Sequence, residues 1–303
     1  MLQLFNYNAG AGDCIRIRFD GHNIIIDSGT TRFGPGFRRI CNEIRSAGEA
    51  IDALILTHSD ADHIGGLLHN LRLSVDLPIQ EVWMNHGRAS RGDVDLSVRQ
   101  NDEVYALLLK KGISVLPAVS GIEREVGNAR CRILAPDEAD LNACYPDHKT
   151  VPLSVRSDYN YSMAELMDKP IRTRDTSPSN KVSIVFEFAY DEIKMLFTGD
   201  ALPEDIVKKA APFYDLIKLP HHGSVRNISE EWRAIQCRNF MICTDGLQHP
   251  DKQTIAKLIK WNDDAKFYVS GSWWRKLLGG DDGKYQGCFV EGEEYLWERE
   301  RIR

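Results

Sequence analysis

The chain has 303 residues and a formal net charge of −6; 43% of its residues are hydrophobic and 27% are charged, as in an ordinary soluble globular protein. No apolar run is long enough to span a membrane, and the opening MLQLFNYNAGAGD has neither the basic nor the apolar part of a signal peptide. We therefore expect a cytoplasmic protein without membrane contact. The negative charge argues against a protein that coats nucleic acid, although a nuclease can use metal ions as its positive charge.

The seven cysteines are scattered along the chain, odd in number and never spaced CxxC. This pattern argues against a disulfide framework or a zinc-ribbon site and favours a reducing compartment. We expect the cysteines to act as small hydrophobic residues that are buried or half-buried.

Alternating strands and helices are predicted along the first part of the chain. Residues 15–19 alternate apolar and polar side chains, as a half-buried strand does, and residues 22–27 form a β-branched run typical of a buried strand. Residues 37–47 have helical spacing and stop at Gly48. Residues 51–57 again predict a buried strand, which places His58 at its C-terminal end.

The remainder of the chain continues this alternation. Further strands are expected over 81–85, 113–119, 130–134, 216–219, 240–244, 266–269 and 292–297, with a hairpin over 182–189 and 193–198. Helices are expected over 98–111 and 203–211, around 230–235 and over 254–261. Strands followed by helices predict sheets covered by helices. Residues 136–180, rich in Pro, Asp, Ser, Asn and Tyr, break the pattern and predict a partly ordered insertion that forms a lid.

The strongest chemical signal is the run THSDADHIGG, residues 57–66. Two histidines and two aspartates fall within six residues directly after a buried strand, where a rigid scaffold presents functional groups. Histidine and carboxylate together suit Zn, Mn or Fe. Gly65 and Gly66 let the backbone turn closely behind these side chains and start a helix. The run therefore predicts a metal site.

Two later segments are expected to meet this run. FTGD ends a predicted strand at Asp200, and LPHHGS ends another with His221 and His222. Each is only suggestive alone, but with the first run they complete a plausible two-metal set. If residues 219–222 continue as an extended strand, the side chains of the two histidines point in opposite directions and do not both bind one metal.

HxDxDHxGG, followed by GD and then PHHGS, resembles the metallo-β-lactamase superfamily. Within it the pattern is most similar to the hydrolase domain of ComEC-type DNA-uptake proteins and their stand-alone bacterial relatives. Residues 10–15 (GAGDCI), 25–29 (IIDSG) and 245–250 (DGLQHP) resemble the family's GxGD opening, its IDxG strand and its late loop ending in HP. The resemblance covers most of the chain. It implies a four-layer αββα sandwich, formed by residues 1–303 as a single domain.

The resemblance also implies a role for each motif residue. His58 and Asp60 would bind one metal, Asp62 and His63 the other; Asp200 would bridge both metals, and His222 would complete the second site. Asp27, and Asp13 in the GxGD opening, would support the ligands by hydrogen bonds. Next to Gly223 the family places the ligand, which makes His221 a substrate contact; the residues expected to take part in catalysis are Asp62, His221 and His249.

Two departures from the family pattern affect the first metal. Asp60 stands where the superfamily usually has histidine, so the site is richer in oxygen, and Mn rivals Zn as the identity of the two divalent metal ions expected. The usual third histidine of the first metal has no clear counterpart. Asn180 lies where related DNA-uptake-type domains carry Asn and is a possible substitute; His86 and His148 are alternatives.

The chemistry implied is metal-assisted hydrolysis, in which a hydroxide held by two metals attacks an ester centre. The ComEC-type resemblance favours a phosphodiester substrate, either nucleic acid or a nucleotide, and allows a role in bacterial defence. One alternative is hydrolysis of a small-molecule ester, lactone or thioester. The other is a non-catalytic binding subunit with a degenerate metal site. No residue pattern indicates a protein partner.

Overall fold

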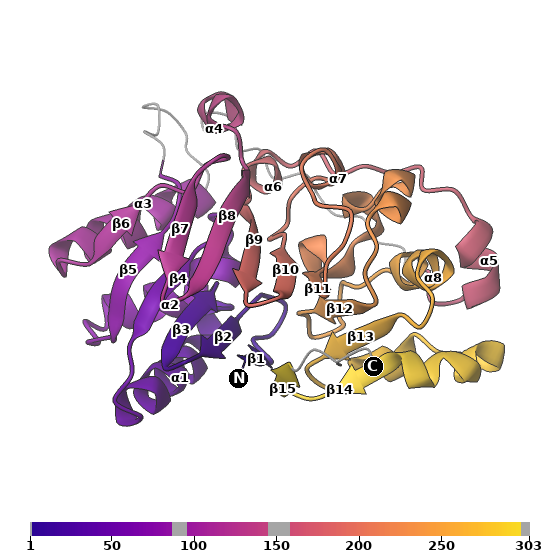
Figure 1. Ribbon diagram of the computed structural model, residues 1–303, viewed down its shortest axis with the longest axis horizontal. Helices are drawn as coiled ribbons and strands as arrows, with labels where there is room; N and C mark the ends of the chain where they lie inside the picture. The colour runs from indigo at the N-terminus through magenta and orange to yellow at the C-terminus, as the bar shows by residue number, and fades with distance from the viewer. Residues whose placement is uncertain (1, 87–95, 145–157, 298–303) are drawn as a thin grey trace.

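The computed structural model describes residues 2–86, 96–144 and 158–297. Two sheets pack face to face, and helices cover their outer faces (Figure 1). In the described residues the first sheet has seven strands in the order β15-β1-β2-β3-β4-β5-β6, and the second has eight in the order β14-β13-β12-β11-β10-β9-β8-β7. The expected four-layer αββα sandwich is confirmed.

Strands of the first sheet are β1 Leu2–Asn6, β2 Ile15–Phe19, β3 His22–Ile26, β4 Ile51–Ile55, β5 Ile79–Trp83, β6 Ser114–Leu116 and β15 Glu294–Trp297. Strands of the second are β7 Glu123–Val126, β8 Ala129–Ala135, β9 Val185–Tyr190, β10 Ile193–Phe197, β11 Leu216–Lys218, β12 Asn239–Ile242, β13 Lys266–Val269 and β14 Phe289–Glu291. β3 to β6 run parallel to one another, as do β10 to β14.

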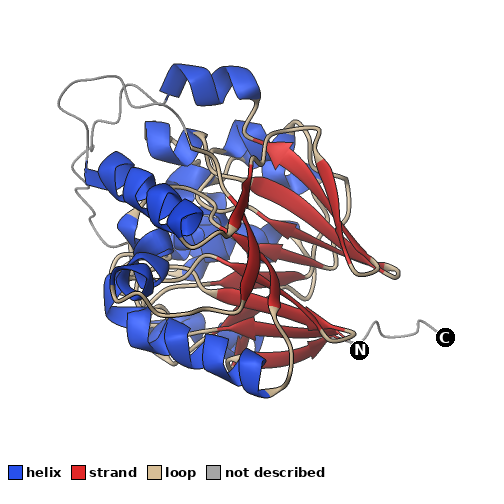
Figure 2. Cartoon of the chain, turned by 90° about the vertical axis from the view of Figure 1, so that its left-hand side faces the viewer, coloured by secondary structure: helices blue, strands red, loops and turns tan. Residues whose placement is uncertain are grey.

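Helices are α1 Gly34–Ser46, α2 Ala61–Arg72, α3 Leu96–Lys110, α4 Glu138–Cys144, α5 Met163–Asp168, α6 Pro178–Lys181, α7 Pro203–Val207 and α8 Lys252–Trp261. Short 3-10 helices are η1 Thr31–Phe33, η2 Pro220–Gly223, η3 Val225–Asn227, η4 Glu230–Ala234, η5 Trp273–Lys276 and η6 Gly280–Cys288. Among these helices, none has both the length and the apolar character that crossing a membrane requires. Figure 2 shows the strands of both sheets gathered together with helices beside them.

The β-branched strands explain the layers. Successive side chains of a strand face opposite sides of a sheet, so Ile24 and Ile26 pack between the two sheets while Ile25 packs under the helices of the first half. Met241 likewise faces the other sheet, whereas its neighbour Phe240 packs under the helices of the second half. These strands are buried on both faces, which is why they read as nearly continuous apolar runs.

Part of the segment expected to form a lid, residues 136–180, packs into the core instead. α5 packs against α8, and its Met163 and Leu166 are fully buried in the core of the second half. The Asp158 carboxylate accepts hydrogen bonds from the backbone N–H groups of Lys252 and Gln253, at the start of α8. Residues 158–168 therefore belong to the outer helical layer, because the segment supplies apolar side chains that its polar composition obscured. A lid stays a prediction for the residues that follow.

Candidate metal centre

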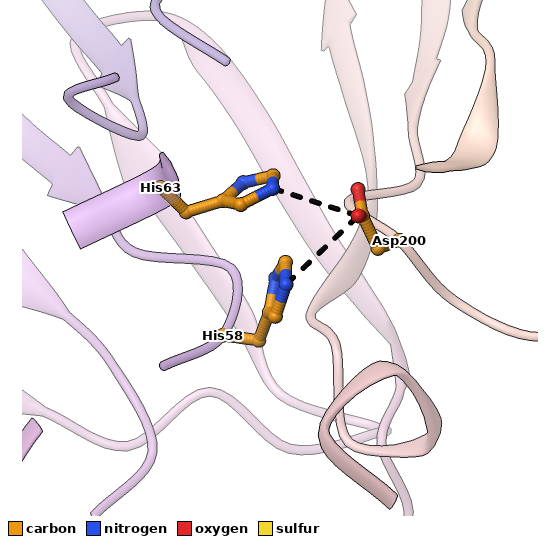
Figure 3. A group of neighbouring side chains, drawn as sticks. All are labelled: His58, His63 and Asp200. Carbon is orange, nitrogen blue, oxygen red and sulfur yellow. Dashed lines mark ion pairs between the residues drawn. The ribbon is translucent and has the colours of Figure 1, made fainter. Parts of the chain in front are cut away.

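One carboxylate oxygen, Oδ2 of Asp200, is the meeting point of three histidines. It lies 3.5 Å from Nε2 of His63, 3.5 Å from Nε2 of His222 and 4.0 Å from Nε2 of His58. Figure 3 shows His58 and His63 pointing toward Asp200. All four residues are buried. His58 follows β4 of the first sheet and His63 lies in α2, whereas Asp200 and His222 follow β10 and β11 of the second sheet. The structure thus brings together side chains from both halves of the sandwich.

The other ring nitrogen of each histidine is held by a hydrogen-bond partner. Nδ1 of His63 lies 2.8 Å from Oδ2 of Asp27, and Nδ1 of His58 lies 3.1 Å from Oγ1 of Thr57. Nδ1 of His222 lies 2.9 Å from the carbonyl oxygen of Cys243 and 3.1 Å from Oδ1 of Asp13. Asp27 and Asp13 therefore lie where supporting carboxylates were expected. Such partners fix the ring orientation of metal-binding histidines.

The remaining nitrogens test whether a metal fits. Nε2 of His58, His63 and His222 and Oδ1 of Asp200 are buried without a hydrogen-bond partner. Buried polar atoms are nearly always paired, so a group of unpaired ones needs an explanation. Nitrogen and oxygen atoms that converge in this way are the donor set that divalent transition metals take. The residues present fit a metal.

The two aspartates of the first motif differ in position. Oδ2 of Asp62 lies 3.4 Å from Nε2 of His222 and 3.8 Å from Nε2 of His63, and ligand atoms of these three residues lie within 4.8 Å of one another. Asp60 lies 3.6 Å from Nε2 of His58, and Ser179 donates a hydrogen bond to its Oδ2 at 3.2 Å. Asp60 thus lies beside His58 at the edge of the centre.

Glycines let the loops around the motif approach closely. A side chain on Gly66 would place Cβ 2.0 Å from the carbonyl oxygen of Ser28, and one on Gly12 would place it 1.7 Å from that of Asp62. α2 therefore packs against the loop after β3, and the GxGD loop lies directly on the metal motif. The glycine pair serves this packing inside α2 rather than a turn before it.

Opposite charges dominate the electrostatics of the centre. Burial would raise the pKa of Asp200, but His222, His63 and His221 outweigh it and lower that pKa. Burial would lower the pKa of His222, but Asp200 and Asp13 outweigh it and raise it to about 10. The pKa of His63 is raised in the same way by Asp200 and Asp27. Without a metal, protons on these histidines balance the carboxylates.

His221 and His222 do not continue a strand, which corrects the extended geometry expected for them. β11 ends at Lys218, and both histidines are in the left-handed region, with φ of 46° and 54°. Gly223 follows with φ of 89°. The tight turn, not strand alternation, sets their rings at 90° to each other. Left-handed backbone at residues other than glycine is strained, and such strain gathers at functional sites.

His221 sits beside a carboxylate that sequence reasoning missed. Its Nδ1 lies 2.9 Å from Nδ2 of Asn180 and 3.4 Å from Oδ2 of Asp175. Asn180 and Asn227 both donate to Asp175, at 2.6 and 2.9 Å. Burial would raise the pKa of Asp175, but hydrogen bonds from His221 and Asn180 lower it. The Asn180 amide nitrogen thus contacts His221 and Asp175, while its Oδ1 accepts a hydrogen bond from Ser179. A lone Asp in a polar loop gave no signal.

The other candidate histidines lie in different places. His249 is 5% exposed with its ring centroid 5.0 Å from that of His221, and both its ring nitrogens are buried without a hydrogen-bond partner. Burial, and then the charges of His221 and His222, lower its pKa to about 3, so the ring is neutral. His86 pairs with Asp102 of α3 at 2.8 Å. His148 lies outside the described residues.

Sequence reasoning also missed Lys218. It stands in an apolar run and is 1% exposed, with its ammonium in contact with Asp13 and 3.6 Å from Oδ1 of Asp200. A charged residue inside a strand that otherwise reads as buried was the available signal, four residues before His222.

Comparisons with known proteins bear on the fold and on the segment that carries the first motif. The family model described as the metallo-beta-lactamase superfamily matches residues 7–74, which include Asp13, Asp27 and the motif from His58 to His63. The metallo-beta-lactamase fold protein YhfI from Bacillus subtilis superposes with a TM-score of 0.51 at 9% identity, covering 88% of this chain and 96% of that one. The chain therefore has the metallo-β-lactamase fold, and the family match supports that superfamily.

Other solved structures are less similar. Igni18, described as a novel metallo hydrolase from the archaeon Ignicoccus hospitalis KIN4/I, has a TM-score of 0.43 at 13% identity, over 88% of this chain and 94% of that one. A diphosphatase of the PhnP family has a TM-score of 0.41 at 12% identity, over 80% and 85%. No curated protein matches the chain in sequence. The ComEC-type resemblance rests on the sequence motifs alone.

Proposed function

We propose that this chain is a metal-dependent hydrolase with a dinuclear site and that its substrate is a phosphodiester. One observation carries the proposal: three buried Nε2 atoms without hydrogen-bond partners converge on Oδ2 of Asp200. His58, Asp60 and Asp200 would hold one ion, and Asp62, His63, His222 and Asp200 the other. When bound, two divalent ions act as Lewis acids on the ester and lower the pKa of water.

The chain's own residues hold this donor set in place. Asp27 accepts from the backbone N–H and the hydroxyl of Thr57 as well as facing His63, so one carboxylate orders the whole start of the motif. Asp60 begins α2 without capping it by its side chain, which leaves that carboxylate free to face His58. Asp62, in the first turn of α2, is stabilised there by the helix dipole.

Two histidines are available to the substrate. Nδ1 of His221 is occupied by Asn180 and Asp175, which orients the ring and leaves Nε2 to give a proton to the leaving oxygen. His221 keeps some solvent access, with its side chain 18% exposed. His249 is neutral and buried, so its role would be to donate a hydrogen bond to a substrate oxygen. Both roles concern the same edge of the centre, since their rings are neighbours.

A phosphodiester fits the charge and the donors of this edge. Nε of Arg226 is buried without a hydrogen-bond partner, and its charge contributes to the lowered pKa of His249 after burial and the other histidines. A guanidinium with an unpaired Nε–H group can donate a hydrogen bond to an anionic phosphoryl oxygen. The aspartates Asp60, Asp62 and Asp200 make the donor set oxygen-rich, which favours Mn. The motif resemblance to ComEC-type domains points to nucleic acid or a nucleotide.

The test is a substrate panel on the full chain reconstituted with Zn or with Mn. We expect hydrolysis of a chromogenic phosphodiester and of single-stranded DNA, faster with Mn than with Zn, and no activity in Asp200→Asn. Robust turnover of a lactone or thioester without phosphodiesterase activity would replace this proposal by the small-molecule alternative. Metal binding without turnover of any panel member would favour a binding subunit. Failure to bind either metal would overturn the proposal.

A further inference from the structure

Lys218, the last residue of β11 in the second sheet, is 1% exposed, and its charged ammonium is buried beside Asp13 and Asp200. Its ammonium contacts Oδ2 of Asp13, donates to the carbonyl oxygen of Gly199 at 2.9 Å and lies 3.6 Å from Oδ1 of Asp200. Burying an ammonium is costly unless it is paired and hydrogen-bonded. The hydrogen bond to Gly199 and the two neighbouring carboxylates meet that requirement.

Asp13 is the carboxylate whose role this ammonium decides. It is fully buried, and its ligand atoms lie within 4.8 Å of those of Asp200 and His222, and also of those of Asp27 and His63. Asp13, like Asp62, is therefore close enough to other ligand-type atoms to bind a metal, but it faces Nδ1 of His222, whereas Asp62 faces Nε2. Asp13 also differs from Asp62 in its neighbouring cation. Among the described lysines and arginines, Lys218 is the one with a nitrogen within 4.0 Å of Asp13 or Asp200.

We propose that Lys218 is a positioning residue that keeps Asp13 out of the metal ligand set. The ammonium neutralises Oδ2 of Asp13, and Oδ1 lies 3.1 Å from Nδ1 of His222, which also contacts the Cys243 carbonyl oxygen. Metals are thereby directed to the Nε2 side of the histidines, where Asp62 and Oδ2 of Asp200 lie. Removing the ammonium frees one buried carboxylate as a further oxygen ligand. This inference rests on the proposed metal-dependent function.

The experiment compares Lys218→Met with wild type after loading the full chain with Co²⁺. The visible absorption of Co²⁺ weakens when its coordination number rises, so recruitment of Asp13 should lower the absorption per bound ion. Lys252→Met is the matched control, because Lys252 is also 1% exposed and pairs with the buried Asp282 at 2.6 Å. Both variants should lose thermal stability, but only Lys218→Met should lose absorption per bound ion.

A second variant keeps the test decisive if Lys218→Met does not fold. Asp13→Asn leaves Lys218 in place and should bind Co²⁺ more weakly, as Asp27→Asn should, but at saturating Co²⁺ it should retain the wild-type spectrum, because Asp13 supports His222 without being a ligand. A changed spectrum of saturated Asp13→Asn would overturn the inference, as would a wild-type spectrum in folded Lys218→Met. Wild-type protein that binds no Co²⁺ would instead remove the proposed function itself.

Discussion

Oδ2 of Asp27 lies 2.8 Å from Nδ1 of His63, and both side chains are fully buried. The carboxylate fixes which ring nitrogen faces the metal centre. Asp27→Asn should therefore weaken metal affinity, by about 10–100-fold as is typical of such partners. Calorimetric metal titration measures the change.

The surface pair His22–Asp52 provides the control for this prediction, since Nδ1 of His22 lies 2.9 Å from Oδ1 of Asp52. Asp52→Asn removes the same kind of contact from the beginning of β3 and β4, away from the motif that follows β4, and should leave metal affinity unchanged. Equal metal affinity in the two variants would contradict the role given to Asp27.

The adjacent histidines of η2 should respond differently to substitution. His222→Ala removes a nitrogen that faces Asp200 and Asp62, so it should lose metal at the second site together with activity. His221→Ala should keep its metals and lose turnover by about 10²–10⁴-fold if the ring acts as the general acid. Elemental analysis with steady-state rates decides between them. The opposite pattern, with metal lost only from His221→Ala, means that the assignment must be reversed.

Asp175 should act on catalysis only through His221. Asp175→Asn should keep metal content and lower kcat more than it raises KM, because it disturbs the ring that protonates the leaving oxygen. In a double-mutant cycle with His221→Ala, we expect a coupling of about 0.5–3 kcal/mol, as for residues in contact. Additive effects would show that Asp175 serves the fold of its loop instead. Asp168→Asn, on the exposed side of α5, is the control that should change neither rate nor metal content.

Metal binding should release protons and strengthen as pH rises. The raised pKa values of His63 and His222 mean that both rings are positively charged at pH 7 in the metal-free chain, with a proton on each ring nitrogen. A metal must displace one of these protons from each ring. Calorimetry at pH 7.5 in buffers of different ionisation enthalpy should therefore show net proton release. An enthalpy that is independent of the buffer would contradict protonated histidines.

The same shift has a consequence for the stability of the metal-free chain. The pKa of His222 is raised from 6.5 to about 10, so its stabilising charge is fully present below pH 6.5 and is lost as pH rises through about 10. The Tm of metal-free protein should fall over that window. Metal-loaded protein should lose less, because the ion replaces the proton. Parallel losses would count against this linkage.

Limited proteolysis should distinguish the buried part of residues 158–180 from the exposed part. Buried side chains anchor residues 158–168, which should resist cleavage, whereas Arg172, Thr173 and Arg174 are exposed. We expect cleavage at these arginines by trypsin, and protection by bound substrate if the residues near Asp175 cover the centre. If substrate does not slow the cleavage, the prediction that these residues form a lid is wrong.

The first motif could be recognised as a candidate site from the sequence because its chemistry is local. Two histidines and two aspartates within six residues need only one strand end to bring them together, and the family pattern supplied Asp200 and His222. Asp175 and Lys218 could not be recognised in this way. Each acquires its role from a neighbour far along the chain, His221 for Asp175 and Asp13 for Lys218.

The extended backbone predicted for His221 and His222 was wrong for a related reason. Extended backbone is the natural expectation after the strand residues 216–219, but Pro220 opens η2 and the next three residues adopt positive φ. α5 was hidden for the opposite reason. Its polar surroundings dominate the composition of residues 136–180, while two apolar side chains suffice to seat it in the core.

Because the proposed ligands come from both sheets, an ion at Asp200 would join the two halves of the sandwich as a cross-link does. His58 and His63 follow β4 in the first sheet, whereas Asp200 and His222 follow β10 and β11 in the second. An ion held by both is bound only while the sheets are docked, so its binding free energy adds to the free energy that separates docked from undocked halves. Removing it by chelation should broaden the unfolding transition, since the halves are then free to open one after the other.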